Sequence, residues 1–319
     1  MTSTHDTDSD SHTDTDASGG NHGGTGTGTH GDSGTDTSSA SHGGTDVVAE
    51  RHGGVLLLRL NRPQRHNAIG GTMLRDLAEA FDQAAADDSV HVVVTTGTDG
   101  SFSVGADAAE LGPGARPPAR DLLTGNDVGG DKGLPPLSPH RRSLDDLGNA
   151  GRWTLRMWQL EKPTIAAVNG AAVGGGFGIA LLHDILIAGE SARLGAGFAP
   201  IGLTAELGIS YLLPRIVGAV AAAELLFTGR LVGALEAKEL GLVAETVADG
   251  RLLDRAMEMA QRIASMPPLG VQSSKRLLRR SMHGDLTDQL RAEHAAQLML
   301  FDHPDTHAAL DRLAARIKR

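Results

Sequence analysis

Residues 164–182 of this 319-residue chain read TIAAVNGAAVGGGFGIALL. An apolar run at 164–168 leads to three consecutive glycines, Gly174 to Gly176, and a second apolar run follows at 179–182. Short apolar runs bounded by glycine are typical of buried strands, and the second run begins a helical pattern. The stretch therefore predicts a turn from a strand into a helix. Glycines in such a turn let backbone amides approach a ligand closely.

Three kinds of site use glycines at such a turn. A dinucleotide site requires G-x-G-x-x-G, but Ile179 stands where the third glycine is needed, and the G-K-[ST] of a P-loop occurs nowhere in the chain. The third kind is an oxyanion hole, in which two backbone amides from separate loops hold a developing negative charge. Residues 101–107, SFSVGAD, would supply the second amide. Spacing alone is equally consistent with tight packing of a helix against a strand.

Apolar patterning outward from this turn predicts strands early in the chain and helices late. We expect strands at 55–60, 90–96, 164–168 and 184–188, and a helix at 72–86 with Met73, Leu74, Leu77 and Phe81 on one face. Further helices are expected at 206–217, 219–227, 234–240, 252–265, 267–281, 285–302 and 305–317. The predicted fold class is α/β or α+β, in one core domain with ββα units in its first half. The expected division is a core over 47–255 and a C-terminal helical region over 256–319.

Two segments differ in composition from this core. Residues 1–46 contain eight Asp and no Lys or Arg, so we expect a disordered tail. Residues 112–150, which hold six of the 13 Pro, are expected to form a surface insertion and a candidate lid. Without the tail, the net charge of −10 becomes −2, which does not favour a nucleic-acid partner.

Several classes of protein are excluded by what the sequence lacks. The absence of Cys excludes a disulfide scaffold and a thiol nucleophile. No apolar run reaches the roughly 18 residues of a membrane span, and the N-terminus lacks the basic and apolar regions of a secretory signal. We expect a cytoplasmic protein that binds neither membranes nor nucleic acid.

An ordered series of motifs runs along the chain. It comprises LNRP at 60–63, FSVGAD at 102–107, KPTIAAVNG at 162–170, the triple glycine, LPRIVG at 213–218 and AKELGLV at 237–243. This series resembles the crotonase superfamily, the enoyl-CoA hydratase/isomerase family. The resemblance implies a crotonase-like spiral of ββα units with a C-terminal helical trimerisation region. It also implies a homotrimer or homohexamer and an acyl-CoA substrate, with no separate cofactor and no metal.

The same resemblance implies which residues form the site. The two oxyanion-hole amides fall on Ala106 and Gly175. The coenzyme A contacts fall on Gln64, Arg65, His66, Ala106, Asp107, Ala108 and Ala109. For His66, a loop histidine without a role is equally consistent, and Asp107 is expected mainly to shape its turn. Outside this set, His183 and Asp184 are expected to be structural.

Departures from the family pattern decide the expected reaction. Hydratases of this family carry glutamates where this chain has Gly178 and Phe198, which we expect to line the acyl pocket instead. Adding water to a conjugated thioester needs carboxylates to activate the water and to deliver a proton. Without them, ordinary hydratase chemistry is not expected.

A different carboxylate, Glu206, lies within GLTAELG at 202–208. This segment is similar to the one that supplies the single catalytic glutamate of Δ3,Δ2-enoyl-CoA isomerases. An apolar lining would raise the pKa of Glu206 and suit it to carry a proton. Alternatively, Glu206 is an acid in the first turn of a helix, held there by the helix dipole without a catalytic role.

These expectations favour an enoyl-CoA isomerase with Glu206 as its acid and base. Two alternatives stay open. One is an enoyl-CoA hydratase or carbon–carbon lyase that acts on an unusual acyl-CoA with Glu206 and an ordered water. The other is a non-catalytic acyl-CoA-binding homologue.

Overall fold

The computed structural model describes residues 46–109 and 137–317. Its larger sheet has six strands in the order β1 (Val47–His52), β2 (Val55–Leu60), β3 (Val92–Gly97), β5 (Thr164–Val168), β7 (Ile185–Gly189) and β10 (Glu245–Val247). β1 pairs antiparallel with β2, and every other pair in this sheet is parallel. The central strands β3 and β5 are buried along their whole length, as is typical of parallel strands covered on both faces.

A second sheet turns the fold into a spiral. It contains β4 (Ser101–Ser103), β6 (Ala171–Val173), β8 (Arg193–Gly195) and β9 (Val232–Gly233). Each of β3, β5 and β7 is followed within a few residues by a strand of this smaller sheet, so successive turns of the chain stack on one another. Gly170 makes one such turn possible, because a Cβ there would collide with the carbonyl of Gly100. The α/β fold predicted for this chain is confirmed.

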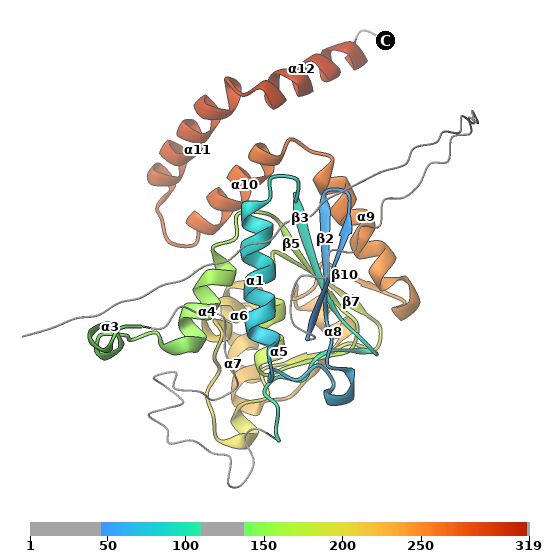
Figure 1. Cartoon of the computed structure of the whole chain (residues 1–319), viewed down its shortest axis with the longest axis vertical. Coiled ribbons are helices and arrows are strands. Elements are labelled where there is room, and N and C mark those ends of the chain that lie inside the picture. The colour runs from blue at the N-terminus through green and yellow to red at the C-terminus, as the bar shows by residue number, and fades with distance from the viewer. Residues whose placement is uncertain (1–45, 110–136, 318–319) are drawn as a thin grey trace, which may run out of the picture. The chain divides into compact units, whose positions relative to one another are not determined.

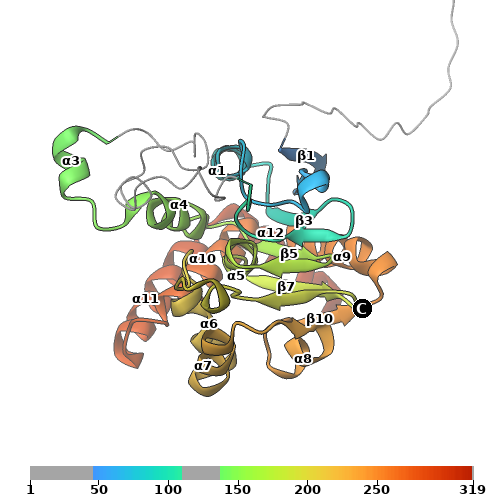
Figure 2. The ribbon, with the colours of Figure 1, turned by 90° about the horizontal axis from the view of Figure 1, so that it is seen from below.

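Helices cover both faces of the larger sheet (Figures 1 and 2). α9 (Leu252–Ala264) packs its buried Leu252, Ala256 and Ala260 on one face. The core on the other side includes α1 (Met73–Ala86), α4 (Gly148–Trp158) and α5 (Gly175–Leu181). Trp153 of α4 is fully buried and donates a hydrogen bond from its indole nitrogen to the carbonyl of Leu74, at 2.8 Å, which joins α4 to α1.

Shorter helices connect the layers. They are α3 (Pro139–Ser143), α6 (Ile209–Val217), α7 (Ala219–Thr228), α8 (Ala234–Glu239) and the 3-10 turns η1 (Pro63–Arg65), η2 (Ala199–Ile201) and η3 (Asp249–Arg251). α10 (Pro268–Arg280) is tied to the core by charge. The ammonium of Lys275 and the guanidinium of Arg279 lie 2.6 Å and 3.0 Å from the carboxylate of Asp184. Burial lowers the pKa of Lys275 to about 8, although Asp184 acts in the opposite direction.

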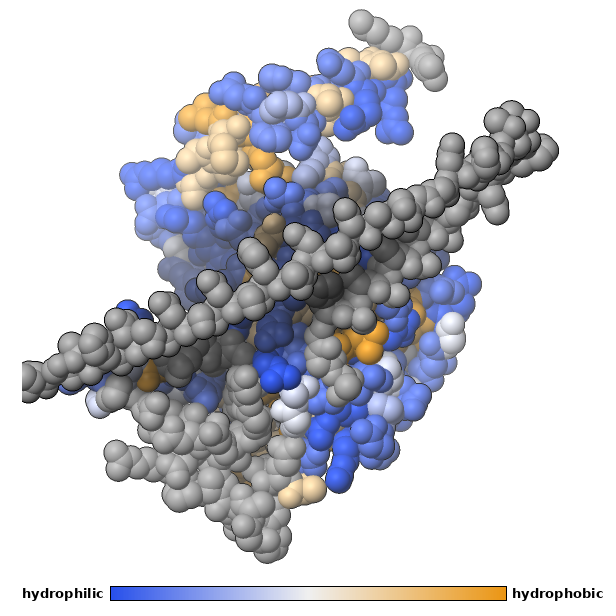
Figure 3. All heavy atoms as spheres, viewed as in Figure 1, coloured by the Kyte–Doolittle hydropathy of each residue, from blue (hydrophilic) through white to orange (hydrophobic). Residues whose placement is uncertain are grey.

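The last two helices expose an apolar surface. Neither α11 (Leu286–Phe301) nor α12 (Pro304–Ile317) has a buried residue. Figure 3 shows apolar side chains along both helices, and the exposed ones are Leu286, Leu290, Leu298, Met299, Phe301, Leu310, Leu313 and Ile317. No helix among residues 46–109 and 137–317 combines the length and apolar character that crossing a membrane would require.

Some predicted boundaries need correction. The helix expected from residue 206 begins at Ile209, because Leu207 and Gly208 have φ of +53° and +79° and cannot continue a right-handed helix. The insertion expected at 112–150 lies largely outside the described residues, and its described end contains α3 and the start of α4.

Two predicted domain boundaries also cut into the folded part. Asp46, expected in the tail, accepts a hydrogen bond from the Thr72 amide at 2.7 Å, and its carbonyl accepts one from the Asn61 amide at 2.8 Å. The division expected after residue 255 falls inside α9, whose buried residues belong to the core.

Candidate active site

Two loops meet at the glycine-rich turn between β6 and α5. A Cβ added to Gly105, in the loop after β4, would lie 2.7 Å from the carbonyl oxygen of Val173 and 3.1 Å from the amide nitrogen of Gly175. Gly105 and Gly174 have φ of +84° and +57°, a region that disfavours other residues. Glycine at these positions therefore lets the two loops touch.

The amide of Ala106 is oriented by its neighbours. Ile69 donates a hydrogen bond to the carbonyl of Gly105 at 2.7 Å, and its carbonyl accepts one from the amide of Asp107 at 2.9 Å. These two bonds form a parallel bridge between Ile69 and Ala106. In such a bridge the residue between the two bonds directs its own N–H away from the partner chain. The Ala106 amide thus points away from Ile69.

Neither the amide of Ala106 nor that of Gly175 has a hydrogen-bond acceptor within the part of the chain that the structure describes. The two residues lie on loops that touch, as Gly105 and Gly175 show. Two free donors from separate loops are the arrangement that an oxyanion hole requires. The amides of Ala106 and Gly175 are therefore the candidate donors of an oxyanion hole.

Apolar side chains lie beside the turn that contains Gly174 and Gly175. A Cβ on Gly175 would lie 2.7 Å from Cδ1 of Ile69 and 3.5 Å from Cδ1 of Leu207. A Cβ on Gly174 would lie 3.8 Å from Cζ of Phe198. Phe198 thus lies beside the glycine-rich turn at Gly174–Gly176, which is called the oxyanion turn below. Ile69 and Leu207 were not predicted from sequence, because nothing near them in the chain indicates which turn they contact.

Leu207 also occupies the space that a side chain at position 178 would need. A Cβ on Gly178 would lie 2.7 Å from the Cβ of Leu207 and 3.5 Å from Cγ1 of Ile209. A larger side chain at 178 would therefore require the backbone of one segment to move. Leu207 itself has φ of +53°, an uncommon conformation for leucine that costs about 1–2 kcal/mol.

Glu206 precedes Leu207, so it adjoins a side chain that contacts the oxyanion turn. Its carbonyl accepts a hydrogen bond from the amide of Ile209 at 3.1 Å. Glu206 lies before α6 rather than in its first turn, so the position that the helix-dipole alternative assumed is wrong. The residue is exposed in the single chain, so the described residues do not enclose it in the expected apolar lining.

The residues expected to contact coenzyme A come together at one edge of this site. Gln64, Arg65 and His66 are exposed in and after η1, and the carbonyl of His66 accepts a hydrogen bond from the amide of Val104 at 3.3 Å. Ala106, Ala108 and Ala109 are also exposed. Asp107 differs, because it is buried and its Oδ1 accepts a hydrogen bond from the Ala109 amide at 3.0 Å. That bond supports the expected role of Asp107 in shaping the turn.

His183 and Asp184 have the structural contacts expected of them. The ring nitrogens of His183 lie 2.8 Å from the carbonyl of Ile179 and 2.8 Å from the hydroxyl of Thr95. Burial lowers the pKa of His183 to about 4, so the ring is neutral near pH 7. Asp184 accepts hydrogen bonds from the amide and hydroxyl of Thr164 at 2.8 Å and 2.9 Å.

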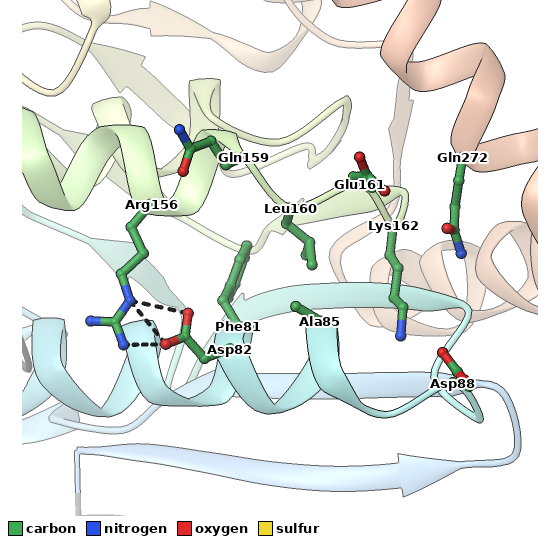
Figure 4. Close-up of a pocket in the computed structure, with 10 residues that line it drawn as sticks. All are labelled: Phe81, Asp82, Ala85, Asp88, Arg156, Gln159, Leu160, Glu161, Lys162 and Gln272. Carbon is green, nitrogen blue, oxygen red and sulfur yellow. Dashed lines mark hydrogen bonds and ion pairs between the residues drawn. The ribbon is translucent and has the colours of Figure 1, made fainter.

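A separate polar pocket of about 440 Å³ lies among α1, α4 and α10. Figure 4 shows the ion pair of Asp82 and Arg156 on one side of it and Lys162 and Gln272 on the other. The ammonium of Lys162 is already bound to the carbonyls of Ala84 and Asp87, both at 2.6 Å. None of the expected site residues lines this pocket. No cluster of three or more potential metal ligands occurs among the described residues.

The two stacked sheets carry Ala106 and Gly175 on touching loops, and the same fold occurs in enoyl-CoA hydratases of known structure. A family model described as enoyl-CoA hydratase/isomerase matches residues 50–124 and 148–318. The chain belongs to the enoyl-CoA hydratase/isomerase family, within the crotonase superfamily, and is an acyl-CoA enzyme of that family.

Individual relatives agree with this family. The chain is 38% identical to a probable enoyl-CoA hydratase of Mycobacterium tuberculosis over 245 residues, which are 76% of this chain and 80% of the relative. It is 33% identical to a 1,2-epoxyphenylacetyl-CoA isomerase of Escherichia coli over 76% of this chain and 86% of the relative. The crystal structure of an enoyl-CoA hydratase from Bacillus anthracis matches with a TM-score of 0.73 and 28% identity, over 85% of this chain and 96% of that one.

Proposed function

We propose that this protein is an enoyl-CoA isomerase that moves a carbon–carbon double bond in an acyl-CoA thioester. Glu206 removes a proton from C2 of a 3-enoyl thioester. The electron pair of the broken C–H bond forms a C1–C2 double bond, and the carbonyl π electrons move onto the thioester oxygen. The amides of Ala106 and Gly175 donate hydrogen bonds to that oxygen while it carries negative charge. Glu206 then returns the proton to C4, which leaves the double bond between C2 and C3.

The contact between Leu207 and Gly178 is the observation that carries this proposal. It leaves no space for a carboxylate at 178, because the two Cβ positions would be 2.7 Å apart. Phe198, an apolar ring, stands at the other position where hydratases carry a glutamate. Hydration needs groups that activate water and deliver a proton, whereas a double-bond shift needs one group that takes and returns the same proton.

Hydration remains the second candidate because of the relatives. The Mycobacterium tuberculosis relative is named a probable hydratase, and the Escherichia coli relative is named an isomerase. A hydratase or lyase built on this chain would use Glu206 with an ordered water. A chain that only binds acyl-CoA would have no turnover in either direction.

A paired assay separates these functions. A 3-enoyl-CoA is monitored for the appearance of conjugated thioester absorbance, and a 2-enoyl-CoA for its loss. We expect conjugation to appear from the 3-enoyl substrate and Glu206→Gln to reduce the rate about 10²–10⁴-fold, as for loss of a general acid–base group. Glu190→Gln, which alters another exposed glutamate, is the control and should retain the wild-type rate.

Other results would contradict the proposal. Loss of conjugation from the 2-enoyl substrate with formation of a 3-hydroxyacyl product would make the protein a hydratase. An unchanged rate in Glu206→Gln would remove Glu206 from the mechanism. Tight acyl-CoA binding without turnover of either substrate would favour the binding-only alternative.

We also propose that the protein forms a homotrimer or homohexamer. The apolar side chains on α11 and α12 support self-association, because an exposed apolar surface of this extent is costly in water. Sedimentation equilibrium is expected to give three or six times the mass of the 33.1 kDa chain. A monomer over the micromolar range would refute this assignment.

A further inference from the structure

We propose that Arg62 is a positioning residue that fixes the direction of the Ala106 amide in the oxyanion hole. The inference rests on the proposed role of Ala106 and Gly175 in binding the thioester oxygen. It does not require that the reaction be an isomerisation. Arg62 lies in LNRP at 60–63 and has no contact with the reacting atoms in this proposal.

The guanidinium of Arg62 contacts both backbone segments that form the Ile69–Ala106 bridge. Its Nη1 donates a hydrogen bond to the carbonyl of Ala68 at 2.8 Å, one residue before Ile69. Its Nη2 lies 3.1 Å from Oδ2 of Asp107, one residue after Ala106. One planar group thus holds both backbone segments beside the bridge that directs the Ala106 amide.

Both partners of this ion pair are shielded from solvent. The Arg62 side chain is 13% exposed and that of Asp107 is 6% exposed. Pairs with so little exposure are screened less than surface pairs, and removal of Arg62 deprives the buried Asp107 carboxylate of its cationic partner. Arg62 itself also lies 3.8 Å from the carboxylate of Asp46. The contact between Arg62 and Asp107 therefore constrains the loop more strongly than a surface ion pair would.

Arg62 is itself held in place by its main chain. Its amide donates to Oδ1 of Asn67 at 2.8 Å, and the fully buried Asn67 side chain donates to the carbonyls of Thr98 and Ser101 at 2.9 Å and 2.7 Å. The backbone of Arg62 is therefore attached to the framework that carries β3 and β4. On the other side, Oδ1 of Asp107 holds the Ala109 amide.

This arrangement bears on catalysis because an oxyanion donor works over a narrow range of distance. The donor nitrogen must lie about 2.7–3.1 Å from the charged oxygen. A shift of the 105–107 segment would lengthen that bond without removing the amide. Lysine at 62 would keep the charge, but its single ammonium lacks the fork that contacts Ala68 and Asp107 together.

The test uses a bound chromophore, so it does not depend on turnover. A CoA thioester of cinnamic acid absorbs at longer wavelength when hydrogen bonds polarise its carbonyl. The spectrum of this probe is recorded free and saturated with wild type, Arg62→Met, Arg62→Lys and Asp107→Asn, and each Kd is measured. Arg59→Met is the matched control, because Arg59 forms an ion pair with Glu50 at 2.7 Å between β1 and β2.

We expect a red shift with wild type and with Arg59→Met. Arg62→Met should lose more than half of that shift, and Arg62→Lys should recover only part of it. The Kd of the probe for Arg62→Met should change less than about threefold, since Arg62 is not among the residues expected to contact coenzyme A. The kcat for thioester substrates should fall about 10²-fold, near the lower limit for loss of one oxyanion donor.

A full red shift in both Arg62→Met and Asp107→Asn would overturn the proposal. If Arg62→Met does not fold, judged by its melting curve, Asp107→Asn decides, because it keeps a neutral acceptor for the Ala109 amide. A wild-type complex without any red shift would refute the oxyanion site and this inference together. A wild-type shift that depends on Arg62, in a protein without isomerase turnover, would support the inference and refute only the proposed function.

Discussion

The stability of the fold should depend on pH through one buried histidine. The His183 ring is buried between α5 and β3, with 2.8 Å contacts to the carbonyl of Ile179 and the hydroxyl of Thr95. Burial lowers its pKa from 6.5 to about 4. The native protein therefore keeps this ring neutral at pH values where the unfolded chain has bound a proton.

The sign and size of the effect follow from this difference. Between pH 6.5 and pH 4 the unfolded state binds more protons than the native state, so the free energy of unfolding falls as pH falls. The stability contributed by the neutral ring is fully present above pH 6.5 and is lost progressively toward pH 4. At 1.36 kcal/mol per pKa unit, this residue accounts for a loss of about 3 kcal/mol.

Urea unfolding of wild type and His183→Asn between pH 7.5 and pH 4 measures this contribution. The variant should be less stable at pH 7.5, because it loses packing and the contact with Thr95. Its free energy of unfolding should then decrease about 3 kcal/mol less than that of wild type on acidification. Carboxylates titrate in both proteins and cancel in the comparison. Equal pH dependence in the two proteins would refute the reasoning.

Three further predictions concern packing and charge. Gly178→Glu should lower the melting temperature without creating hydratase activity, because its Cβ would lie 2.7 Å from that of Leu207; a variant that melts like wild type and hydrates a 2-enoyl-CoA would contradict this. Asp184→Asn should cost about 3 kcal/mol in urea unfolding, since it leaves Lys275 and Arg279 without their carboxylate; a change below 1 kcal/mol would show that the ion pairs contribute little. Deleting residues 1–45 should leave the melting temperature unchanged, whereas deleting 1–46 should lower it, because Asp46 accepts from Thr72; equal melting temperatures would place Asp46 outside the cooperative fold.

The long elements of this fold were predictable from sequence because their patterns repeat within a few residues. The helix predicted at 72–86 corresponds to α1, and the strands predicted at 55–60 and 164–168 correspond to β2 and β5. The strands β4, β6 and β8 have three residues each, too few for an alternating pattern, and they are defined by pairing with one another. α4 was missed because Gly148 and Gly151 disfavour a helix that the burial of Trp153 stabilises.

The sequence motifs predicted which residues belong to the site but not the contacts between distant segments that orient them. The resemblance indicated Ala106 and Gly175, and the structure places them on touching loops. The direction of the Ala106 amide depends on pairing with Ile69, 37 positions away in the chain. The contact of Leu207 with Gly178 likewise joins segments that share no local pattern. The exposure of Glu206 could not be predicted, because it depends on how the chain folds around the turn before α6.

The two proposed oxyanion donors are main-chain groups, whereas the proposed proton carrier is a side chain. Mutation therefore affects oxyanion binding and proton transfer differently. At position 106 every residue except proline supplies the same N–H, so among single substitutions there only proline deletes the donor. The proposed proton carrier is one side chain, which a single codon change can remove. A lineage with this fold can therefore lose or exchange its proton-transfer residue while its main-chain amides still donate hydrogen bonds to the thioester carbonyl. Laboratory evolution toward a new reaction should begin with the side chains around Glu206 and leave both turns intact.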